Sequence, residues 1–327
     1  MNLLENLKCL CFFILIFVGQ NGLAQEQAAE KSIHLADPTI FFHEGIYYLY
    51  GTVEGNANQG FLVYSSPDLK EWEGPIGANQ GFALRKGEAF GDKGFWAPQV
   101  FYHQDKFYMA YTANENIAIA ESDSPLGPFT QSIKKPLEAP VKQIDPFVFI
   151  DEDGKTYLYH VRLAEGNRLF VAEMAEDLSA IRPETLKECI NAADPWENTQ
   201  EVPWPVAEGP SILKKDSLYY LVYSANDFRN PDYAVGYAIS SHPMGPWKKQ
   251  DSNPILGRTD IGINGPGHGD FISDKQGGLH YVFHTHYSNS EVAPRKTAIV
   301  KAGFSEDTDT GEHKLVMDMG SFYYPEI

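Results

Sequence analysis

Cysteine is scarce in this chain. The sequence holds three cysteines, of which Cys9 and Cys11 stand near the N-terminus and Cys189 stands alone in the rest. Removal of the N-terminal segment would leave a single thiol, so no intrachain disulfide could form. The hydrophobic core must therefore stabilise the folded protein.

Long apolar runs are equally scarce. One stands at residues 9–18 (CLCFFILIFV), after Lys8 and before GQNGLAQ, where Gly22 and Ala24 supply the small residues of a cleavage site. The run is too short to span a membrane, and nothing later in the sequence is long enough. We predict a cleaved signal peptide at residues 1–24, no membrane span, and a mature protein that is periplasmic or secreted. An uncleaved N-terminal anchor is the alternative.

Basic residues are outnumbered by acidic ones. The chain has 26 Lys and Arg against 44 Asp and Glu, which gives a formal net charge of -18 at pH 7. Such a field repels the phosphate backbones of nucleic acids and anionic lipid surfaces. The charge balance therefore excludes a nucleic-acid partner and favours a neutral or cationic one, while it leaves the oligomeric state open.

Aromatic and turn-forming residues are abundant. The chain has 18 Tyr, 20 Phe and 5 Trp beside 28 Gly and 21 Pro. Aromatic side chains favour strands, whereas Gly and Pro favour turns. No stretch shows a sustained helical period. These features predict an all-β protein.

The sequence contains an internal repeat. Each copy has a small or acidic residue, often followed by Pro, then an apolar strand, a polar turn and an aromatic-rich strand. A third strand follows in each copy. The copies are ADPTIFFHEGIYYLYGT from Ala36, WAPQVFYHQDKFYMAYTA from Trp96, IDPFVFIDEDGKTYLYH from Ile144, EGPSILKKDSLYYLVYSA from Glu208 and GHGDFISDKQGGLHYVFHT from Gly267. The repeat predicts a five-bladed β-propeller that forms a single domain over residues 25–327. A β-sandwich is the alternative, but it would give shorter and less regular spacing.

Three acidic residues stand at the starts of repeats. Asp37, Asp145 and Glu208 each precede Pro or Gly-Pro. In a propeller the first strand of each blade lines the central channel, so we expect these acids at equivalent positions around a common funnel. Each alone is typical of a turn. Together they indicate glycoside cleavage, which needs a proton-holding acid beside an ionised base.

The motifs ADPTI, WAPQV, IDPFVF, EGPSI and GPGHGD, in this order, make the chain resemble a family 43 glycoside hydrolase over essentially the whole mature sequence. The resemblance implies a five-bladed propeller that hydrolyses glycosidic bonds with inversion. It implies that Asp37 is the general base and Glu208 the general acid. Asp145 would be the third acid, which orients the general acid and raises its pKa.

The resemblance also implies roles for three further residues. Trp96 would stack on a sugar, with core packing as the alternative. Arg295 would reach the substrate's hydroxyls, with a solvated surface position as the alternative. His268 would approach a structural metal in the channel, often calcium, although calcium prefers oxygen ligands and a core histidine is the alternative. The neighbouring glycines precede a strand rather than a helix, which argues against a phosphate loop, and no organic cofactor is expected.

The resemblance implies a neutral carbohydrate substrate. Terminal α-L-arabinofuranosyl or β-D-xylosyl groups of plant-type glycans are expected, with a galactofuranosidase or exo-galactosidase as the enzymatic alternative. A non-catalytic carbohydrate-binding propeller would lose one of the acids, whereas all three are present. A protein-interaction propeller would repeat Trp-Asp pairs, which do not recur here. His284 and His286 alternate in YVFHTHY and so share one strand face, but two histidines are an incomplete metal site, and they remain unassigned.

Overall fold

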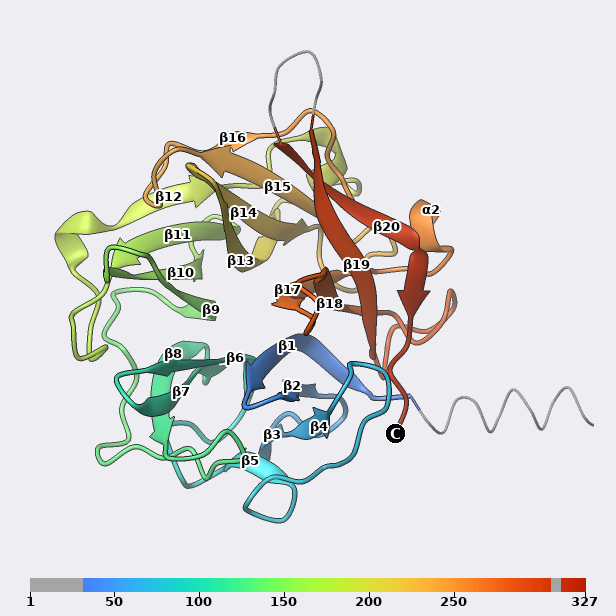
Figure 1. Ribbon diagram of the computed structural model, residues 1–327. Coiled ribbons are helices and arrows are strands. Elements are labelled where there is room, and N and C mark those ends of the chain that lie inside the picture. Colours follow the sequence, from blue (N-terminus) through green and yellow to red (C-terminus); the bar gives the residue numbers. More distant parts are fainter. Residues whose placement is uncertain (1–31, 307–312) are drawn as a thin grey trace, which may run out of the picture.

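The chain forms a ring of five β-sheet blades around a central channel (Figure 1). The computed structural model describes residues 32–306 and 313–327. Strands account for 53% and helices for 3% of the structure, so the predicted all-β propeller is confirmed. The predicted signal peptide at residues 1–24 lies outside the described residues. Within the described ranges, no helix combines the length and the apolar character that crossing a membrane requires.

Each blade is an antiparallel meander that starts at the channel and proceeds outward. Blade one consists of β1 (Leu35–His43), β2 (Ile46–Val53) and β4 (Tyr64–Ser66), with the pair β3 (Gly60–Leu62) and β5 (Phe82–Arg85) at its side. Blade two consists of β6 (Trp96–His103), β7 (Lys106–Ala113) and β8 (Asn116–Ser122). Blade three consists of β9 (Gln143–Ile150), β10 (Thr156–Leu163), β11 (Asn167–Glu173) and β12 (Lys187–Ile190).

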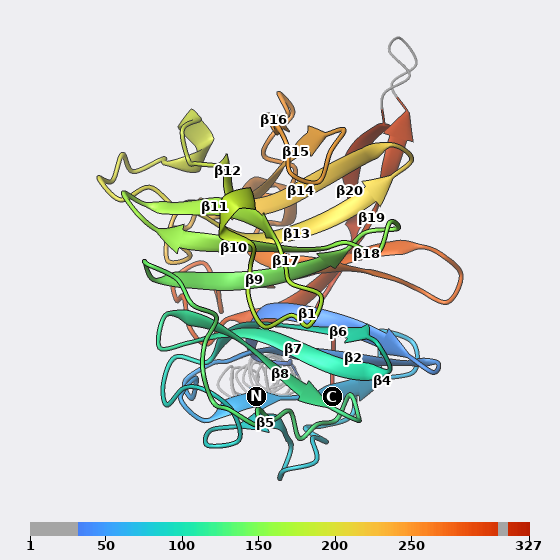
Figure 2. The same cartoon turned by 90° about the vertical axis from the view of Figure 1, so that its left-hand side faces the viewer.

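The last two blades also have four strands. Blade four consists of β13 (Ala207–Lys215), β14 (Leu218–Ala225), β15 (Ala234–Ser240) and β16 (Lys248–Lys249). Blade five consists of β17 (Gly267–Ser273), β18 (Leu279–Thr285), β19 (Lys296–Glu306) and β20 (His313–Tyr323), and the short helix α2 (Arg258–Ile261) precedes it. In Figure 2 the strands of blade three lie between those of blades two and four, as the sequence order requires.

The core consists of apolar and aromatic side chains packed between neighbouring blades. Tyr50, Phe95 and Tyr111 belong to the cluster between blades one and two, and all three are buried. The recurring turn of blades two and four adds a polar contact, because each turn accepts a tyrosine hydroxyl from the preceding blade. Tyr50 donates to the carbonyl of Pro125, and Tyr159 donates to that of Pro243. The aromatic excess of the sequence therefore fills the spaces between blades.

Both ends of the described chain help to close the ring. The backbone N–H of Thr297 in blade five donates to the carbonyl of Ile33 at 2.9 Å. Its hydroxyl donates to the carbonyl of Leu35 at 2.8 Å. At the other end, Trp72 N–H donates to the carbonyl of Glu326 at 3.0 Å. The N-terminal stretch thus binds blade five, while the C-terminal stretch binds blade one.

The innermost strand of every blade carries a bulge at the same place. The strand register shifts there in all five blades. One residue of each bulge adopts a left-handed backbone, which re-aims its side chain. These residues are Asp37 (φ 48°), Ala97 (φ 45°), Asp145 (φ 54°), Gly209 (φ 59°) and His268 (φ 45°). Four of the five are not glycine, and each such backbone costs about 1–2 kcal/mol, so the surrounding structure must hold them in place.

The bulges correct one detail of the sequence interpretation. Glu208 is not equivalent to Asp37 and Asp145, because its strand pairing matches that of Ala36, and Gly209 occupies the bulge position. A side chain at Gly209 would collide with its neighbour, since an added Cβ would lie 2.7 Å from the His268 ring. The acid of blade four therefore stands one residue earlier than the other two.

Four of the five bulge N–H groups donate to a side chain on the second strand of the preceding blade. In each case the acceptor stands on the second strand, opposite the residue before that blade's own bulge. The bonds run from Ala97 to Thr52 Oγ1 (3.0 Å), from Asp145 to Thr112 Oγ1 (2.9 Å), from His268 to Ser224 Oγ (2.7 Å) and from Asp37 to His284 Nδ1 (3.1 Å). These bonds, here named the bulge ring, join every blade except blade three to the next one.

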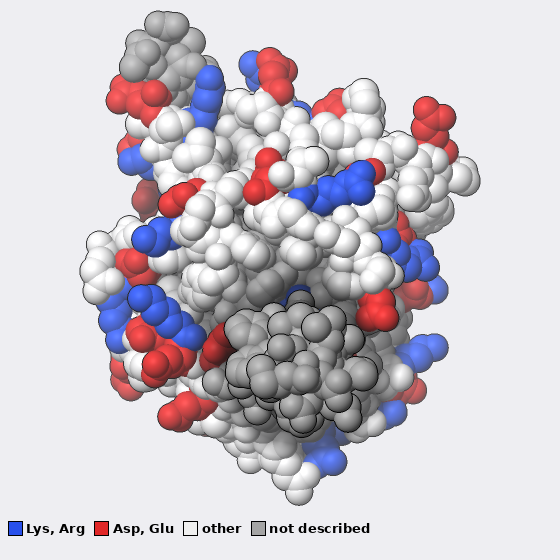
Figure 3. Space-filling model, turned by 90° about the vertical axis from the view of Figure 1, so that its right-hand side faces the viewer, with Lys and Arg blue, Asp and Glu red and all other residues white. Residues whose placement is uncertain are grey.

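Figure 3 shows one face of the molecule, on which Lys and Arg are interspersed with Asp and Glu. Among the described residues on that face, the two signs do not separate into a basic stripe of the kind that binds nucleic acid.

The bulge ring makes a prediction about stability. Thr112→Val keeps the side-chain volume but removes the acceptor of the buried Asp145 N–H, and an unpaired buried donor costs about 1–3 kcal/mol. We expect the free energy of unfolding in urea to fall by this amount. As a control, Thr112→Ser keeps the hydroxyl and loses one buried methyl group, which costs about 0.8 kcal/mol. A Thr112→Val protein as stable as the wild type would contradict a structural role for the bond.

Candidate active site

The bulges of the inner strands surround a cavity of about 320 Å³ at one mouth of the channel. Asn167, Trp204, Asp227 and Phe228 are among its lining residues. The structure also brings together all six residues singled out from the sequence in this lining. They are Asp37, Trp96, Asp145, Glu208, His268 and Arg295.

Asp37 is a buried carboxylate held in the ionised form. Its Oδ2 accepts the Thr52 hydroxyl at 2.7 Å, and its Oδ1 accepts an Arg295 N–H at 3.1 Å. The Nδ1 atoms of His268 and His284 each lie 3.3 Å from Oδ1. Burial alone would raise the pKa of Asp37, but above all the Arg295 guanidinium holds it well below its usual value. Asp37 can therefore accept a proton.

Glu208 is a buried acid that keeps its proton to higher pH. Tyr233 donates its hydroxyl to Oε1 at 2.9 Å, and Asn167 donates its amide to Oε2 at 3.0 Å. Burial raises the pKa of Glu208 to about 7, which the charge of Asp37 favours and the two hydrogen bonds oppose. Near neutral pH, Glu208 can therefore donate a proton.

Asp145 connects the other two acids. Its pKa is raised well above the usual value by burial and then by the charges of Glu208 and Asp37. Its Oδ2 lies 3.9 Å from His268 Nδ1 and accepts the backbone N–H of Gly209 at 3.3 Å. This last bond replaces the missing member of the bulge ring.

The replacement has a cause in the sequence of blade three. Val161 stands opposite Ile144, in the place where the other four blades carry Thr52, Thr112, Ser224 and His284. A valine side chain cannot accept a hydrogen bond. The Gly209 N–H therefore bonds to the Asp145 carboxylate, which ties this acid to the residue that follows Glu208.

Arg295 is buried, with 8% of its surface exposed, so the solvated alternative is excluded. Besides Asp37, its Nε donates to Glu54 Oε1 at 2.7 Å. Its guanidinium lies 4.4 Å from the centre of the Phe228 ring, and the carbonyl of Phe228 lies 2.7 Å from His286 Nε2. Arg295 thus compensates the charge of Asp37 and helps to shape the wall of the cavity.

Trp96 and His268 both line the cavity, but in different surroundings. Trp96 is half-buried and lines the cavity, where its ring can face a ligand. His268 lies between the acids, and burial lowers its pKa although the charge of Asp37 opposes this shift. Beneath it, a small cavity in the channel is lined by Thr39, Gln99 and Asp270, among others.

The residues present do not by themselves form a calcium site. Calcium takes six to eight oxygen ligands, as a rule. Among residues 32–306 and 313–327, no group of three or more His, Cys, Asp or Glu side chains is placed to hold a metal ion. Asp270 Oδ2 in the channel accepts the Thr39 hydroxyl at 2.7 Å. The calcium ion stays a prediction.

Sequence reasoning missed several residues of the site. His284, left unassigned, lies beneath Asp37, and burial lowers its pKa to about 3, so it is neutral. Its alternation with His286 was the only available signal. Asn167 and Trp204 lie outside the repeated motifs, so no pattern pointed to them. Tyr233 ends the inserted loop RNPDY of blade four, and that insertion was the one sequence signal for it.

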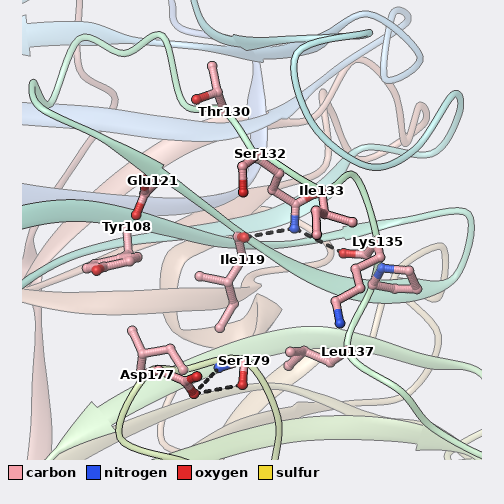
Figure 4. A pocket seen from close by; sticks show the side chains of 13 residues that line it. Tyr108, Ile119, Glu121, Thr130, Ser132, Ile133, Lys135, Leu137, Asp177 and Ser179 are labelled. Carbon is pink, nitrogen blue, oxygen red and sulfur yellow. Dashed lines mark hydrogen bonds between the residues drawn. The ribbon is translucent and has the colours of Figure 1, made fainter.

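A second hollow lies between blades two and three (Figure 4), and it differs from the cavity at the channel mouth in how its polar groups are arranged. This hollow has a volume of about 270 Å³ and lies beside Ile119 and Leu137. Two of its polar residues are engaged with the wall: Gln131 Nε2 donates to the carbonyls of Ile119 and Lys135, and Asp177 accepts from Ser179. They do not converge on the space, unlike the three acids of the channel mouth.

The channel mouth combines a proton-holding carboxyl, an ionised carboxylate and aromatic walls. This is the chemistry of glycoside cleavage, and together with the fold it defines a propeller glycoside hydrolase. The chain belongs to the glycosyl hydrolases family 43, whose family model matches residues 31–309. The predicted family is therefore confirmed.

Known proteins similar to this chain differ in their named activities. The solved structure of an endo-1,4-β-xylanase from Bacteroides thetaiotaomicron is 42% identical, with a TM-score of 0.81, and the match covers 90% of this chain and 97% of that one. A β-D-galactofuranosidase from Aspergillus niger is 23% identical, over 83% of this chain and 80% of the relative. An arabinoxylan arabinofuranohydrolase from Bacillus subtilis is 30% identical over 65% of this chain, which spans 48% of that relative's length.

The raised pKa of Glu208 predicts a pH-dependent effect on stability. Its folded pKa of about 7 exceeds the ordinary value of 4.5, so its contribution is fully present below pH 4.5 and is lost as the pH rises through about 7. Glu208→Gln removes this titration. Relative to the wild type, the variant should gain about 1–3 kcal/mol in free energy of unfolding between pH 5 and pH 8.

Asp177→Asn, at a residue outside the lining of the cavity, provides the control for this measurement. Hydrogen bonds from Ser179 hold the pKa of Asp177 below its ordinary value of 3.8 in the folded protein. Its titration is therefore complete below pH 5 in both states, and the difference between this variant and the wild type should stay constant from pH 5 to pH 8. If the Glu208→Gln difference is equally constant, Glu208 does not hold its proton as described.

Proposed function

We propose that this protein hydrolyses glycosidic bonds with inversion, with Asp37 as general base and Glu208 as general acid. The observation that carries the proposal is that the pKa values of two carboxyls in one cavity are shifted in opposite directions. Such a pair separates the roles of base and acid at one pH.

The proposed reaction is a single displacement. Asp37 takes a proton from a water molecule as the water oxygen bonds to the anomeric carbon. The bond between that carbon and the glycosidic oxygen breaks on the opposite side, and this oxygen receives the proton of Glu208. The products are the sugar with inverted configuration and the free leaving group.

Asp145 and Arg295 are proposed to support the two reacting groups. Asp145 holds the backbone N–H of Gly209, next to the general acid, at 3.3 Å. Its nearby carboxyl also makes loss of the proton from Glu208 less favourable. Arg295 keeps Asp37 ionised at 3.1 Å and lines the cavity, where its guanidinium could also donate to sugar hydroxyls.

The proposed substrate is a plant-type glycan with terminal α-L-arabinofuranosyl or β-D-xylosyl groups. Trp96, Trp204 and Phe228 give the cavity broad apolar faces that suit the C–H surfaces of a neutral sugar. The names of the Bacteroides and Bacillus proteins, which refer to xylan and arabinoxylan, support this class. A galactofuranoside is the second candidate, supported by the name of the Aspergillus relative. We also propose that the protein is exported.

The division of labour between the acids can be tested with two kinds of leaving group. Glu208→Gln should lower the hydrolysis of an arabinoxylan oligosaccharide about 10²–10⁴-fold, and that of a 4-nitrophenyl glycoside much less, because an acidic phenol needs little protonation. Asp37→Asn should impair both substrates alike, since both need activated water. The test measures the rate of each variant on both substrates. If the two variants lose the same activity on each substrate, the assignment is wrong.

The pH profile of kcat/KM should report the same two groups. Activity should fall as the pH rises through about 7, where Glu208 loses its proton. Because the Arg295 guanidinium lowers the pKa of Asp37, Arg295→Met should move the acidic limb to higher pH. Arg182→Met, which breaks an exposed ion pair with Glu173 in blade three, is the control and should leave the profile unchanged. An acidic limb unmoved by Arg295→Met would show that the guanidinium does not set the pKa of Asp37.

A further inference from the structure

Both oxygens of Glu208 face a hydrogen-bond donor, and the two donors differ in kind. Tyr233 is buried behind Oε1, where its ring stacks on His284 with centroids 5.6 Å apart. Asn167 comes from the start of β11 at the edge of the cavity and bonds Oε2. Tyr233 belongs to the protein interior, whereas Asn167 stands at the edge of the cavity, where a substrate would arrive.

A tryptophan fixes the orientation of the Asn167 amide. Trp204 Nε1 lies 2.9 Å from Asn167 Oδ1. An indole nitrogen can only donate, so the atom of Asn167 beside it must be the carbonyl oxygen, and the amide NH₂ must face Glu208. A backbone hydrogen bond also holds Asn167 in place, because its N–H donates to the carbonyl of Pro205 at 2.9 Å.

Trp204 itself is open to solvent. With 47% of its surface exposed, it is one of the few large exposed hydrophobic residues, and it lines the cavity beside Asn167. Trp204 is hydrogen-bonded to Asn167, which is in turn hydrogen-bonded to Glu208. Arg295, at another part of the lining, is hydrogen-bonded to Asp37. Since the general acid faces the glycosidic oxygen, the Trp204 ring belongs to the side where the leaving group binds.

We propose that Asn167 is a positioning residue for the general acid and that Trp204, which binds the leaving-group part of the substrate, holds Asn167 in its working orientation. This inference rests on the proposed function of Glu208. An amide NH₂ has no acceptor, so it cannot take the proton of Glu208. The proton is left free for the glycosidic oxygen, and the amide then stabilises the carboxylate that remains after transfer.

The kinetic test uses Asn167→Ala, Trp204→Phe and the double variant, each with phenyl and 4-nitrophenyl glycosides. Asn167→Ala should lower kcat/KM about ten- to a hundred-fold on the phenyl glycoside, and much less on the 4-nitrophenyl glycoside. Its basic limb should move to higher pH, because a bond that favours the carboxylate is lost. Trp204→Phe keeps an aromatic face but not the N–H, and should show the same pattern in weaker form. The double variant should be no worse than Asn167→Ala.

A matched control removes a similar bond elsewhere. Asn79 donates its amide to Glu88 Oε1 at 2.7 Å, outside the lining of the cavity. Asn79→Ala should leave rates and pH profile unchanged. If Trp204→Phe behaves like the wild type while Trp204→Ala only raises KM, Trp204 is a stacking platform and the proposal is wrong. It is also wrong if Asn167→Ala slows both substrates equally with an unmoved pH profile.

A second measurement does not depend on turnover. The carboxyl carbon of Glu208 can be titrated by NMR in glutamate-labelled protein, with the signal assigned by its loss in Glu208→Gln. Asn167→Ala and, to a smaller extent, Trp204→Phe should move this titration to higher pH. If they do so in a protein that cleaves no glycoside, the proposed function fails while the positioning role stands. An unmoved titration overturns the positioning role whatever the activity.

Discussion

A bulge in each inner strand turns one backbone N–H away from its own sheet, and this donor must find an acceptor in the closely packed channel wall. The preceding blade supplies it through a hydroxyl or an imidazole in four cases. The bulge ring therefore makes the conformation of each blade depend on its neighbour. It holds Asp37, Asp145 and His268 in left-handed backbones that point their side chains into the site, so the architecture and the chemistry share one set of bonds.

The place where this pattern is interrupted is where the acids become connected. Val161 offers no acceptor, and the Gly209 N–H bonds instead to Asp145. One apolar substitution in the second strand of blade three thus converts a structural bond into a contact within the active site. The same glycine leaves room for His268 and shifts Glu208 by one residue. Asp37 lies among positive and imidazole partners, whereas Glu208 has only neutral donors, and their pKa values separate accordingly.

The sequence predicted the features that repeat and missed those that do not. The strand and turn patterns recur in every blade, so the five-bladed ring followed from them, and the residues before each Pro led to the acids. The one-residue offset of Glu208 is visible in the sequence, because aligning the prolines of IDP and EGP places Gly209 opposite Asp145. Only the strand pairing shows that this offset removes Glu208 from the bulge position. Asn167 begins the third strand of blade three, and Trp204 lies in the connection to blade four, and neither belongs to a repeated motif. Asn167 contacts Glu208, and Trp204 contacts Asn167, only through the tertiary structure, which a single sequence does not encode in any local pattern.

Asp37 and Arg295, which form the charged pair of the site, are separated by 258 residues in the chain. During synthesis, blade one is therefore complete long before the cation that compensates its buried carboxylate exists. A partial ring would have to leave Asp37 hydrated or protonated, because an unpaired charge is too costly to bury. The carboxylate acquires its low pKa only when blade five docks against blade one. Closure of the ring therefore completes the charged pair, and a chain lacking blade five would lack the ionised carboxylate that the proposed mechanism requires.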